Sequence, residues 1–371
     1  MERRTFLKIL SSAGIVSLVS PTFAMEVCKN KVSKSSSALL ESAFRNPPFS
    51  SGVYTWWHWM NGNITKDGIT RDLEAMKANG IAGYQLFEAG SGIPIGPVES
   101  LSDEWVDLIL HTLKESERLG LEFAMHNCPG WSSSGGPWIT PDKAMQIITW
   151  SETKITGGKQ VRIQLPTPKH MFDYYIDTYC LAIPANMKVI PRLSILELSN
   201  RLDKDGVLTW DVPTGEWLIM RFGQTAKDQK NKSAPSKSTG LDCDKFSTEA
   251  LDYHLNCMFK RLMPAMEKIA KHSKIGLLID SYETGDQDWT SDMPAYFEQS
   301  HGYELYPFLP VLANKIVESE ESTKRFLFDF RRVRADMFAE RYYGHFQKRC
   351  KEKGIITYTE PYGGHMMEEL Q

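Results

Sequence analysis

One joint recurs three times in this chain: a helix-like stretch, a glycine, and then a short apolar run. It stands at Asn79-Gly80-Ile81, Leu119-Gly120-Leu121 and Lys353-Gly354-Ile355. A glycine in this position ends a helix, because it adopts the left-handed conformation that other residues avoid. Helices that alternate with short apolar strands predict a parallel β/α architecture, in which helices cover the sheet.

The residue pattern gives the extent of each predicted element. Apolar residues at Ile69, Leu73 and Met76 have helical spacing, whereas the strands are short and almost wholly apolar. The expected strands cover residues 52–59, 81–87, 121–125, 275–279 and 355–359. The expected helices cover residues 67–79, 104–119, 247–271 and 323–353.

Polar and aromatic side chains stand at the end of every predicted strand. They are Trp57-His58-Trp59, Phe87-Glu88, His126-Asn127, Asp280-Ser281-Tyr282-Glu283 and Thr359-Glu360. No GxGxxG or phosphate-binding loop follows the first strand, which disfavours an open, doubly wound sheet. Side chains gathered at the carboxyl ends of strands are typical of a (β/α)8 barrel, where they form the active site. We therefore predict an α/β fold with a (β/α)8-type barrel.

Residues 150–235 interrupt the barrel pattern. Alternating polar and apolar residues and turn signals such as Gly157-Gly158 predict an antiparallel β insertion after the third β/α unit. The barrel would then occupy residues 46–149 and 236–371. Only about five β/α units can be counted, whereas a closed barrel needs eight. We therefore expect an incomplete, truncated barrel.

The N-terminal region has the pattern of an export signal. Within residues 1–24, Arg3-Arg4 precedes an apolar run from Ile9 to Val19, and small residues follow near Ala24. The alternative is a short buried helix. The run is too short for a stable membrane span. We expect an exported protein, periplasmic or extracellular, in which residues 25–45 form a polar, Ser-rich linker.

Charge and cysteine content exclude several classes of protein. The net charge is −3, and basic residues are mixed with acidic ones, so nucleic acid is not an expected partner. None of the six cysteines forms a CxxC pair, which leaves a zinc knuckle without support. Disulfides are permitted in an oxidising compartment. The spacing leaves their pairing open.

Two glutamates are candidates for glycoside chemistry, which needs a pair of carboxyl groups around the bond to be cleaved. Glu283 follows an apolar strand, and the partial burial expected there would favour its protonated form and suit a general acid. Glu360 holds the same place on the next strand. The alternative is that each glutamate only caps a helix or forms an ion pair.

Sugar-binding side chains are also expected at these strand ends. Aromatic faces stack on the C–H side of sugars, and amide, imidazole and carboxyl groups bind hydroxyls. The candidates are Trp57, His58, Trp59, Asn61, His126, Asn127, Trp131, Asp280 and Trp289. The alternative is that the tryptophans are core residues and that the Gly/Ser-rich stretch after Asn127 is a turn.

Three long motifs resemble glycoside hydrolase family 106, the inverting α-L-rhamnosidases. They are Trp57-His58-Trp59-Met60-Asn61-Gly62-Asn63, Gly130-Trp131-Ser132-Ser133-Ser134-Gly135-Gly136-Pro137-Trp138, and Asp280-Ser281-Tyr282-Glu283 with Trp289-Thr290. The resemblance extends from about residue 45 to the end and implies a (β/α)8 catalytic barrel with accessory β-domains. It also implies release of terminal α-L-rhamnose from plant pectic glycans, with a calcium ion that helps to hold the sugar.

The resemblance also assigns roles. Glu283 matches the family's general acid, whereas the family's general base lies farther along than Glu360. We therefore take Glu360 as a substrate-binding carboxylate first and as a candidate base second. The residues leave the calcium ligands unassigned, because oxygen ligands such as Asp and Glu are common.

Two other functions stay open. The chain could be a non-catalytic carbohydrate-binding protein that keeps the aromatic platform but lacks the base. It could also be a metal-dependent barrel hydrolase that uses His58 and His126, although the sequence contains no HExxH motif.

Overall fold

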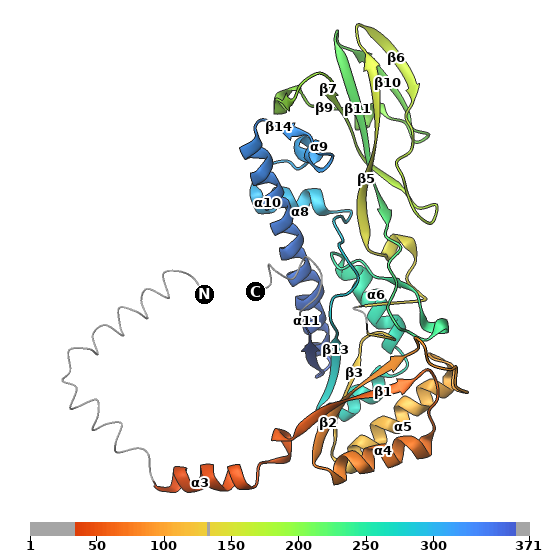
Figure 1. The fold of residues 1–371 in the computed structure, drawn as a ribbon, viewed down its shortest axis with the longest axis vertical. Coiled ribbons are helices and arrows are strands. Elements are labelled where there is room, and N and C mark those ends of the chain that lie inside the picture. Colours follow the sequence, from red (N-terminus) through yellow and green to blue (C-terminus); the bar gives the residue numbers. More distant parts are fainter. Residues whose placement is uncertain (1–33, 132–133, 361–371) are drawn as a thin grey trace, which may run out of the picture. The chain divides into compact units, whose positions relative to one another are not determined.

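The computed structural model describes residues 34–131 and 134–360 (Figure 1). The chain divides into two compact units, residues 1–53 and 54–371. The described part of the first unit contains helix α3 (Lys34–Arg45) and the short helix η2 (Phe49–Ser51). Helix α3 therefore lies within residues 25–45, where we predicted a linker. An ion pair between Arg45 and Glu41, one turn apart, supports this helix.

A five-stranded sheet forms the centre of the second unit. Its spatial order is β1-β2-β3-β13-β15. Strand β3 pairs in parallel with β2 and with β13, and β13 pairs in parallel with β15. The strands are β1 (Val53–Met60), β2 (Ile81–Ala89), β3 (Glu122–His126), β13 (Ile275–Ile279) and β15 (Ile356–Thr359). These are the five predicted strands, within a few residues at each end.

Helices α4 (Lys66–Ala78) and α5 (Asp103–Leu119) follow β1 and β2 and pack against each other (Figure 1). Thr65 and Ser102 cap their first turns by accepting backbone N–H bonds. Gly120 ends α5 with φ of 65°, as the recurring joint predicts.

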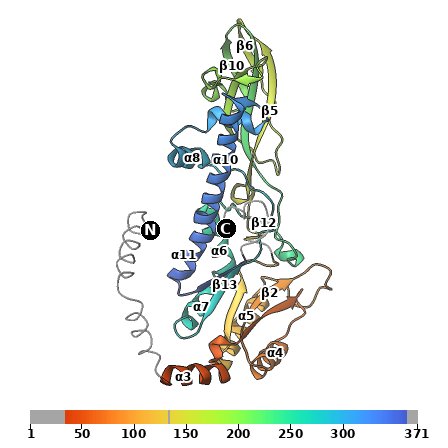
Figure 2. The same cartoon turned by 60° about the vertical axis from the view of Figure 1, so that its left-hand side comes forward.

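The remaining helices follow later in the chain. They are α6 (Thr248–Phe259), α7 (Met263–Ile269), α8 (Met293–His301), α9 (Leu309–Leu312), α10 (Glu320–Met337) and α11 (His345–Glu352). A π-helical segment, η8 (Phe338–Gly344), joins α10 to α11, so that one long helix precedes β15 (Figure 2). Short 3-10 turns lie at η3 (Pro141–Lys143), η4 (Arg192–Ser194), η5 (Ser199–Arg201), η6 (Ser236–Ser238) and η7 (Tyr306–Phe308).

Antiparallel strands fill the region between β3 and α6, in agreement with the predicted insertion (Figure 1). One sheet has the order β5-β11-β7-β9, and a separate pair joins β10 to β6. These strands are β5 (Gln146–Thr156), β6 (Lys159–Gln164), β7 (Ile176–Pro184), β9 (Leu196–Glu197), β10 (Val207–Val212) and β11 (Glu216–Ala226). A small core of its own, which includes Trp210, Leu208 and Ile219, stabilises the insertion.

Two pairs of very short strands connect distant segments. Strand β4 (Gly135–Gly136) pairs with β12 (Leu241–Asp242), and β8 (Val189–Ile190) pairs with β14 (Ile316–Val317). The second pair joins the insertion to the chain just before α10. Both pairs connect the insertion or its flanks to the β/α part of the molecule.

We predicted a (β/α)8-type barrel that is incomplete, and the described residues form no closed barrel. They give a mixed α/β fold with an open five-stranded sheet, and an eight-stranded (β/α)8 barrel is not confirmed. The predicted export signal, residues 1–24, lies outside the described residues. None of the helices described is long and apolar enough to cross a membrane.

The cysteines give no disulfide within the described residues. Cys128, Cys180, Cys243 and Cys350 are buried there, and Cys257 is partly exposed. Cys28 lies outside the described part of the chain.

Candidate active site

Three carboxyl groups lie at the ends of the neighbouring strands β13 and β15. Asp280 follows β13 directly, and Glu283 lies three residues later. Glu360 follows β15, and its N–H donates to the Ile279 carbonyl (3.0 Å). Because β13 and β15 pair in parallel, Ile279 opposite Thr359, their carboxyl ends meet at the same edge of the sheet.

Asp280 is the buried carboxyl of this group, and its side chain is 3% exposed. The pKa of Asp280 is raised to about 7, chiefly by burial and also by the nearby carboxyls of Glu360 and Glu283, while the N–H of Ser281 opposes this shift. In the folded protein Asp280 therefore keeps its proton up to about pH 7.

Glu283 is partly buried. Its side chain is 37% exposed, between the buried residues Tyr282 and Thr284. It accepts a hydrogen bond from the Ser281 hydroxyl (3.2 Å) and lies 3.7 Å from the Lys232 ammonium. The deepest burial among the three carboxyls is at Asp280.

The tryptophans of β1 are divided between its two faces. Side chains alternate along a strand, and Trp57 and Trp59 point into the hydrophobic core at 7% and 1% exposure. The Trp57 indole N–H donates to Asp72 (3.0 Å). Neither residue can offer its face to a sugar in this structure, which corrects our prediction. Trp56, on the opposite face, is 42% exposed.

An aromatic cluster lies on this opposite face. The Phe87 ring contacts both His58 and His126, with centroid distances of 3.9 Å and 4.6 Å. Trp56 meets the edge of Phe87 at 5.1 Å, and the half-buried Trp131 lies 6.2 Å away. Three strands, β1, β2 and β3, thus supply one aromatic surface with a partly exposed rim.

His126 connects the aromatic cluster to the carboxyl group. Its Nδ1 lies 3.2 Å from the Gly130 carbonyl and 3.7 Å from Asp280. Burial lowers the pKa of His126 to about 3, so the imidazole is neutral and the contact with Asp280 is not an ion pair. Its Nε2 has no hydrogen-bond partner among the described residues. His58, by contrast, is exposed.

Asn61, Asn127 and Trp289 have structural contacts rather than open faces. Asn61 has a left-handed backbone (φ 50°) at the end of β1 and donates to the Ile93 carbonyl (2.8 Å). Asn127 is fully buried, donates to the Leu278 carbonyl (2.8 Å) and accepts from Ser134 (2.6 Å). Trp289 has no exposed surface and is a core residue. Among the described residues, the predicted binding side chains that retain exposure are His58 and Trp131.

A polar loop that the sequence did not link to the site lies beside it. Lys232 belongs to the chain between β11 and β12, and its carbonyl accepts the Trp131 N–H (3.2 Å). The next carbonyl, that of Ser233, accepts the N–H of Gly90 after β2 (2.6 Å). These bonds hold Lys232 next to Glu283. Strand alternation could have selected Trp56 from the sequence, and Phe87 was among the side chains at the strand ends, but no local signal indicated Lys232.

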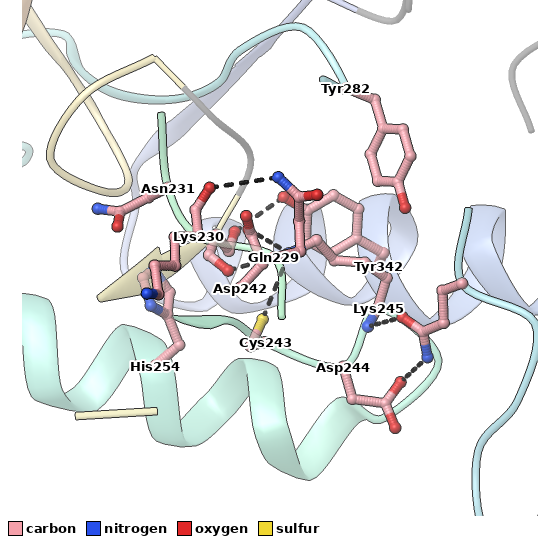
Figure 3. A network of polar contacts seen from close by, with 12 residues as sticks. Gln229, Lys230, Asn231, Asp242, Cys243, Asp244, Lys245, His254, Tyr282 and Tyr342 are labelled. Carbon is pink, nitrogen blue, oxygen red and sulfur yellow. Dashed lines mark hydrogen bonds and ion pairs between the residues drawn. The ribbon is translucent and has the colours of Figure 1, made fainter. Parts of the chain in front are cut away.

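A buried ionic network supports the loops around the site (Figure 3). Lys245 has no exposed surface, and its ammonium donates to Asp242 and to the Ser134 carbonyl, both at 2.9 Å. Burial is the largest influence and lowers the pKa of Lys245, but the charges of Asp242, Cys243 and Tyr282 and the hydrogen bond to Asp242 together outweigh it, so the net pKa is raised. Lys245 therefore stays charged and fixes β12 to the motif that contains Ser134.

The π-helical segment contributes to the same network. Tyr342 lies on this segment and shares a hydrogen bond with the Ser134 hydroxyl (2.8 Å), while Lys245 lies 5.2 Å above its ring. His254 on α6 reaches the Asn127 carbonyl (2.9 Å) and accepts the Trp138 indole N–H (3.2 Å). Helices α6 and η8 thus hold the end of β3 from two sides.

The geometry assigns no metal ligands. Within the described part of the chain, no three His, Cys, Asp or Glu side chains come together as a metal site. The structure therefore gives no ligands for the calcium ion that the resemblance implies. The ring of Phe87 packs against the imidazoles of both His58 and His126.

Comparison with known proteins gives consistent matches. The model of glycoside hydrolase family 106, described as α-L-rhamnosidase, matches residues 45–173 and 169–370. A Formosa agariphila protein named "Putative beta-glucuronidase" is 41% identical over 356 residues, which cover 88% of this chain and 31% of that protein.

A solved structure gives the same picture of the fold. The rhamnosidase from Novosphingobium sp. PP1Y matches with a TM-score of 0.79 and 24% identity, over 89% of this chain and 48% of that one. The chain thus spans about a third and about a half of the lengths of these two proteins. Since the family model matches nearly all of residues 45–370, the chain belongs to glycoside hydrolase family 106, the α-L-rhamnosidase family.

Proposed function

We propose that this protein acts in the hydrolysis of terminal α-L-rhamnosides in plant pectic glycans, with inversion at the anomeric carbon. The observation that supports this most is the group of Asp280, Glu283 and Glu360 at the ends of two neighbouring strands, beside the aromatic cluster. Family membership supports the same reaction class.

In this proposal Glu283 gives a proton to the glycosidic oxygen as the bond to the anomeric carbon breaks. A water molecule attacks that carbon from the opposite face, and a second carboxylate takes the proton of the water. Glu283 is suited to the first role because it is partly open to solvent and is held by Ser281. Asp280 is suited to hydrogen bonding with a sugar hydroxyl, since it carries a proton near neutral pH.

The variant Glu283→Gln tests this proposal. We expect it to reduce rhamnose release from pectic oligosaccharides by roughly 10²–10⁴-fold, because general acid catalysis contributes about that factor. Activity on an activated aryl rhamnoside, whose leaving group needs no proton, should fall much less. Equal rates for Glu283→Gln and wild type on the oligosaccharide would exclude the role of Glu283.

A second candidate function is supported by the family resemblance, which places the general base farther along the chain than Glu360. A chain without another base would bind rhamnose-tipped oligosaccharides without turnover. Isothermal titration with such an oligosaccharide, followed by analysis for free rhamnose, separates binding from hydrolysis.

Calcium binding and export are further parts of the proposal. Calcium is proposed on the family resemblance, and a rise in melting temperature with added calcium, reversed by a chelator, would support it. Export through residues 1–24 is proposed on the paired arginines and the apolar run. Fractionation of cells that express the full chain tests it.

A further inference from the structure

A second concave site lies on the β-rich insertion. It is a cavity of about 390 Å³. Its walls are the first part of β5 (residues 147–150), the end of β11 with the residues after it (225–228), and residues 169–171. None of these residues belongs to the aromatic cluster or to the strand-end carboxyls, so the cavity is separate from the candidate active site.

A strained turn forms one edge of this cavity. The Tyr174 N–H donates to the Met171 carbonyl (3.0 Å), and the two residues between them, Phe172 and Asp173, have positive φ values of 58° and 51°. Such a turn strongly prefers Asn, Asp or Gly at both positions, and a bulky residue there is unfavourable. Strain of this kind persists where the surrounding structure imposes it, and it clusters at functional sites.

The strand beside the turn imposes this conformation. The Thr225 hydroxyl accepts the Met171 N–H (3.0 Å) and donates to the Tyr174 carbonyl (2.8 Å). Met171 lines the cavity and is 37% exposed, and the next residue, Phe172, is 43% exposed. Glycine at position 172 would relax the backbone, so the aromatic side chain there does not serve stability.

The chemistry of the walls points to an acidic glycan. The half-buried Trp150 and the exposed Phe172 can stack on the C–H faces of sugar rings. Lys169 is exposed and has no ion-pair partner among the described residues, whereas the acidic wall residue Asp228 is already paired with Lys230 at 3.7 Å. The free charge at the cavity is therefore positive and suits a carboxylate.

The cavity is connected to the loop that holds Glu283. The Ile148 N–H donates to the Asp288 carboxyl (2.8 Å), and the Lys227 ammonium donates to the Asp286 carbonyl (2.5 Å). Both acceptors lie within five residues of Glu283, on the same loop. A glycan held in this cavity would thus contact residues that are bonded directly to the loop of the candidate active site.

We propose that this cavity is a distal binding site for a uronic-acid-containing segment of the glycan substrate. Trp150 and Phe172 stack on its sugar rings, and Lys169 binds a carboxylate. The nature of the occupant rests on the proposed function, since it assumes that the protein acts on glycans. The site itself rests on the cavity, the strained aromatic turn and the unpaired lysine.

Calorimetric titration of the full chain tests this proposal. The probe is an oligosaccharide of alternating rhamnose and galacturonic acid, compared with the same oligosaccharide after reduction of its carboxyl groups. Wild type should bind the acidic probe at least about fivefold more tightly, and added salt should weaken that binding. Failure to bind the acidic probe, or equal binding of both probes, would overturn the proposal.

Phe172→Gly is the most informative variant. It relieves the positive φ, so its melting temperature should rise, while its affinity for the acidic probe should fall roughly tenfold, as for a buried aromatic contact. Unchanged affinity would refute the role of Phe172. Leu193→Ala is the matched control, because Leu193 is 91% exposed on the same insertion and distant in sequence from the turn.

Lys169→Met tests the charge. It should lower the affinity for the acidic probe about fivefold and leave the affinity for the reduced probe unchanged. The control Lys159→Met, at an exposed lysine on β6, should change neither affinity. Binding is measured without turnover, in the Glu283→Gln background. If the variants follow these binding patterns while the wild-type chain releases no rhamnose, the distal site is upheld and the proposed hydrolysis is rejected.

Discussion

Two buried polar regions of this molecule have opposite electrostatics. In the network around Lys245, a buried ammonium faces the Asp242 carboxylate, so opposite charges neutralise each other. At the ends of β13 and β15, the buried Asp280 faces two further carboxyls and a neutral imidazole. The first arrangement holds loops in place, whereas the second holds a proton. Burial therefore indicates a structural role in one region and a chemical role in the other.

Removal of Lys245 should have the largest effect on stability. Lys245→Met leaves Asp242 buried without its cation, and breaking a buried pair in this way costs about 3–5 kcal/mol. Urea unfolding measures the change. The control Lys230→Met, at an exposed lysine, should stay within about 0.5 kcal/mol. A double variant with Asp242→Leu should recover part of the loss, and strict additivity would contradict the pairing.

Asp280 should make the folded protein less stable as the pH rises. Its folded pKa is about 7, whereas an unfolded aspartate titrates near 4. Between these values the unfolded chain releases the proton first, so the free energy of unfolding falls from pH 4 to pH 7. Because Asp280 interacts electrostatically with the carboxyls of Glu360 and Glu283, we expect only part of the full linkage effect, a fall of about 2 kcal/mol. Asp280→Asn should remove this fall, as unfolding curves at pH 4.5 and 7.5 would show.

His254 in the Lys245 network should have the opposite pH dependence. The pKa of His254 is lowered to about 3, chiefly by burial and also by the charge of Lys245, while its hydrogen bond to Asn127 opposes this shift. Below pH 6.5 the histidine is protonated in the unfolded chain but stays neutral in the folded protein. The free energy of unfolding should therefore fall by about 1 kcal/mol as the pH is lowered from about 6.5 to about 5.5. His254→Gln should flatten this part of the profile. An unchanged slope would show that another group causes it.

Trp56 should give the smallest effect, on binding alone. Its ring is 42% exposed and is perpendicular to the ring of Phe87, so Trp56→Ala should weaken binding of rhamnosides about fivefold and change stability by less than about 0.5 kcal/mol. Trp57→Ala is the contrasting variant, since it removes core packing. A loss of stability in Trp56→Ala equal to that in Trp57→Ala would reject our division of the two faces of β1.

The sequence predicted the elements well because their signals are local. The glycine joints and the apolar spacing around Ile69 and Leu73 located α4, α5 and the five strands, and turn signals located the insertion. The sequence also predicted which strand ends lie together, since parallel strands present their carboxyl ends at one edge. It misassigned Trp57 and Trp59, although strict alternation along β1 would have selected Trp56.

Other features depended on contacts between residues far apart in the chain. Asp280 is more deeply buried than Glu283, and the neighbouring strand β15 brings Glu360 close to it. The bonds that hold Lys232 beside Glu283 come from loops after β2 and β3.

The sequence by itself determined the family, the order of helices and strands, and the carboxyls at the strand ends, because each is written in consecutive residues. The tertiary structure alone decided which carboxyl keeps a proton, which tryptophan meets solvent, and where a strained turn exposes Phe172. These properties depend on burial and on charges within a few ångströms. Both are set by packing between segments that lie far apart along the chain.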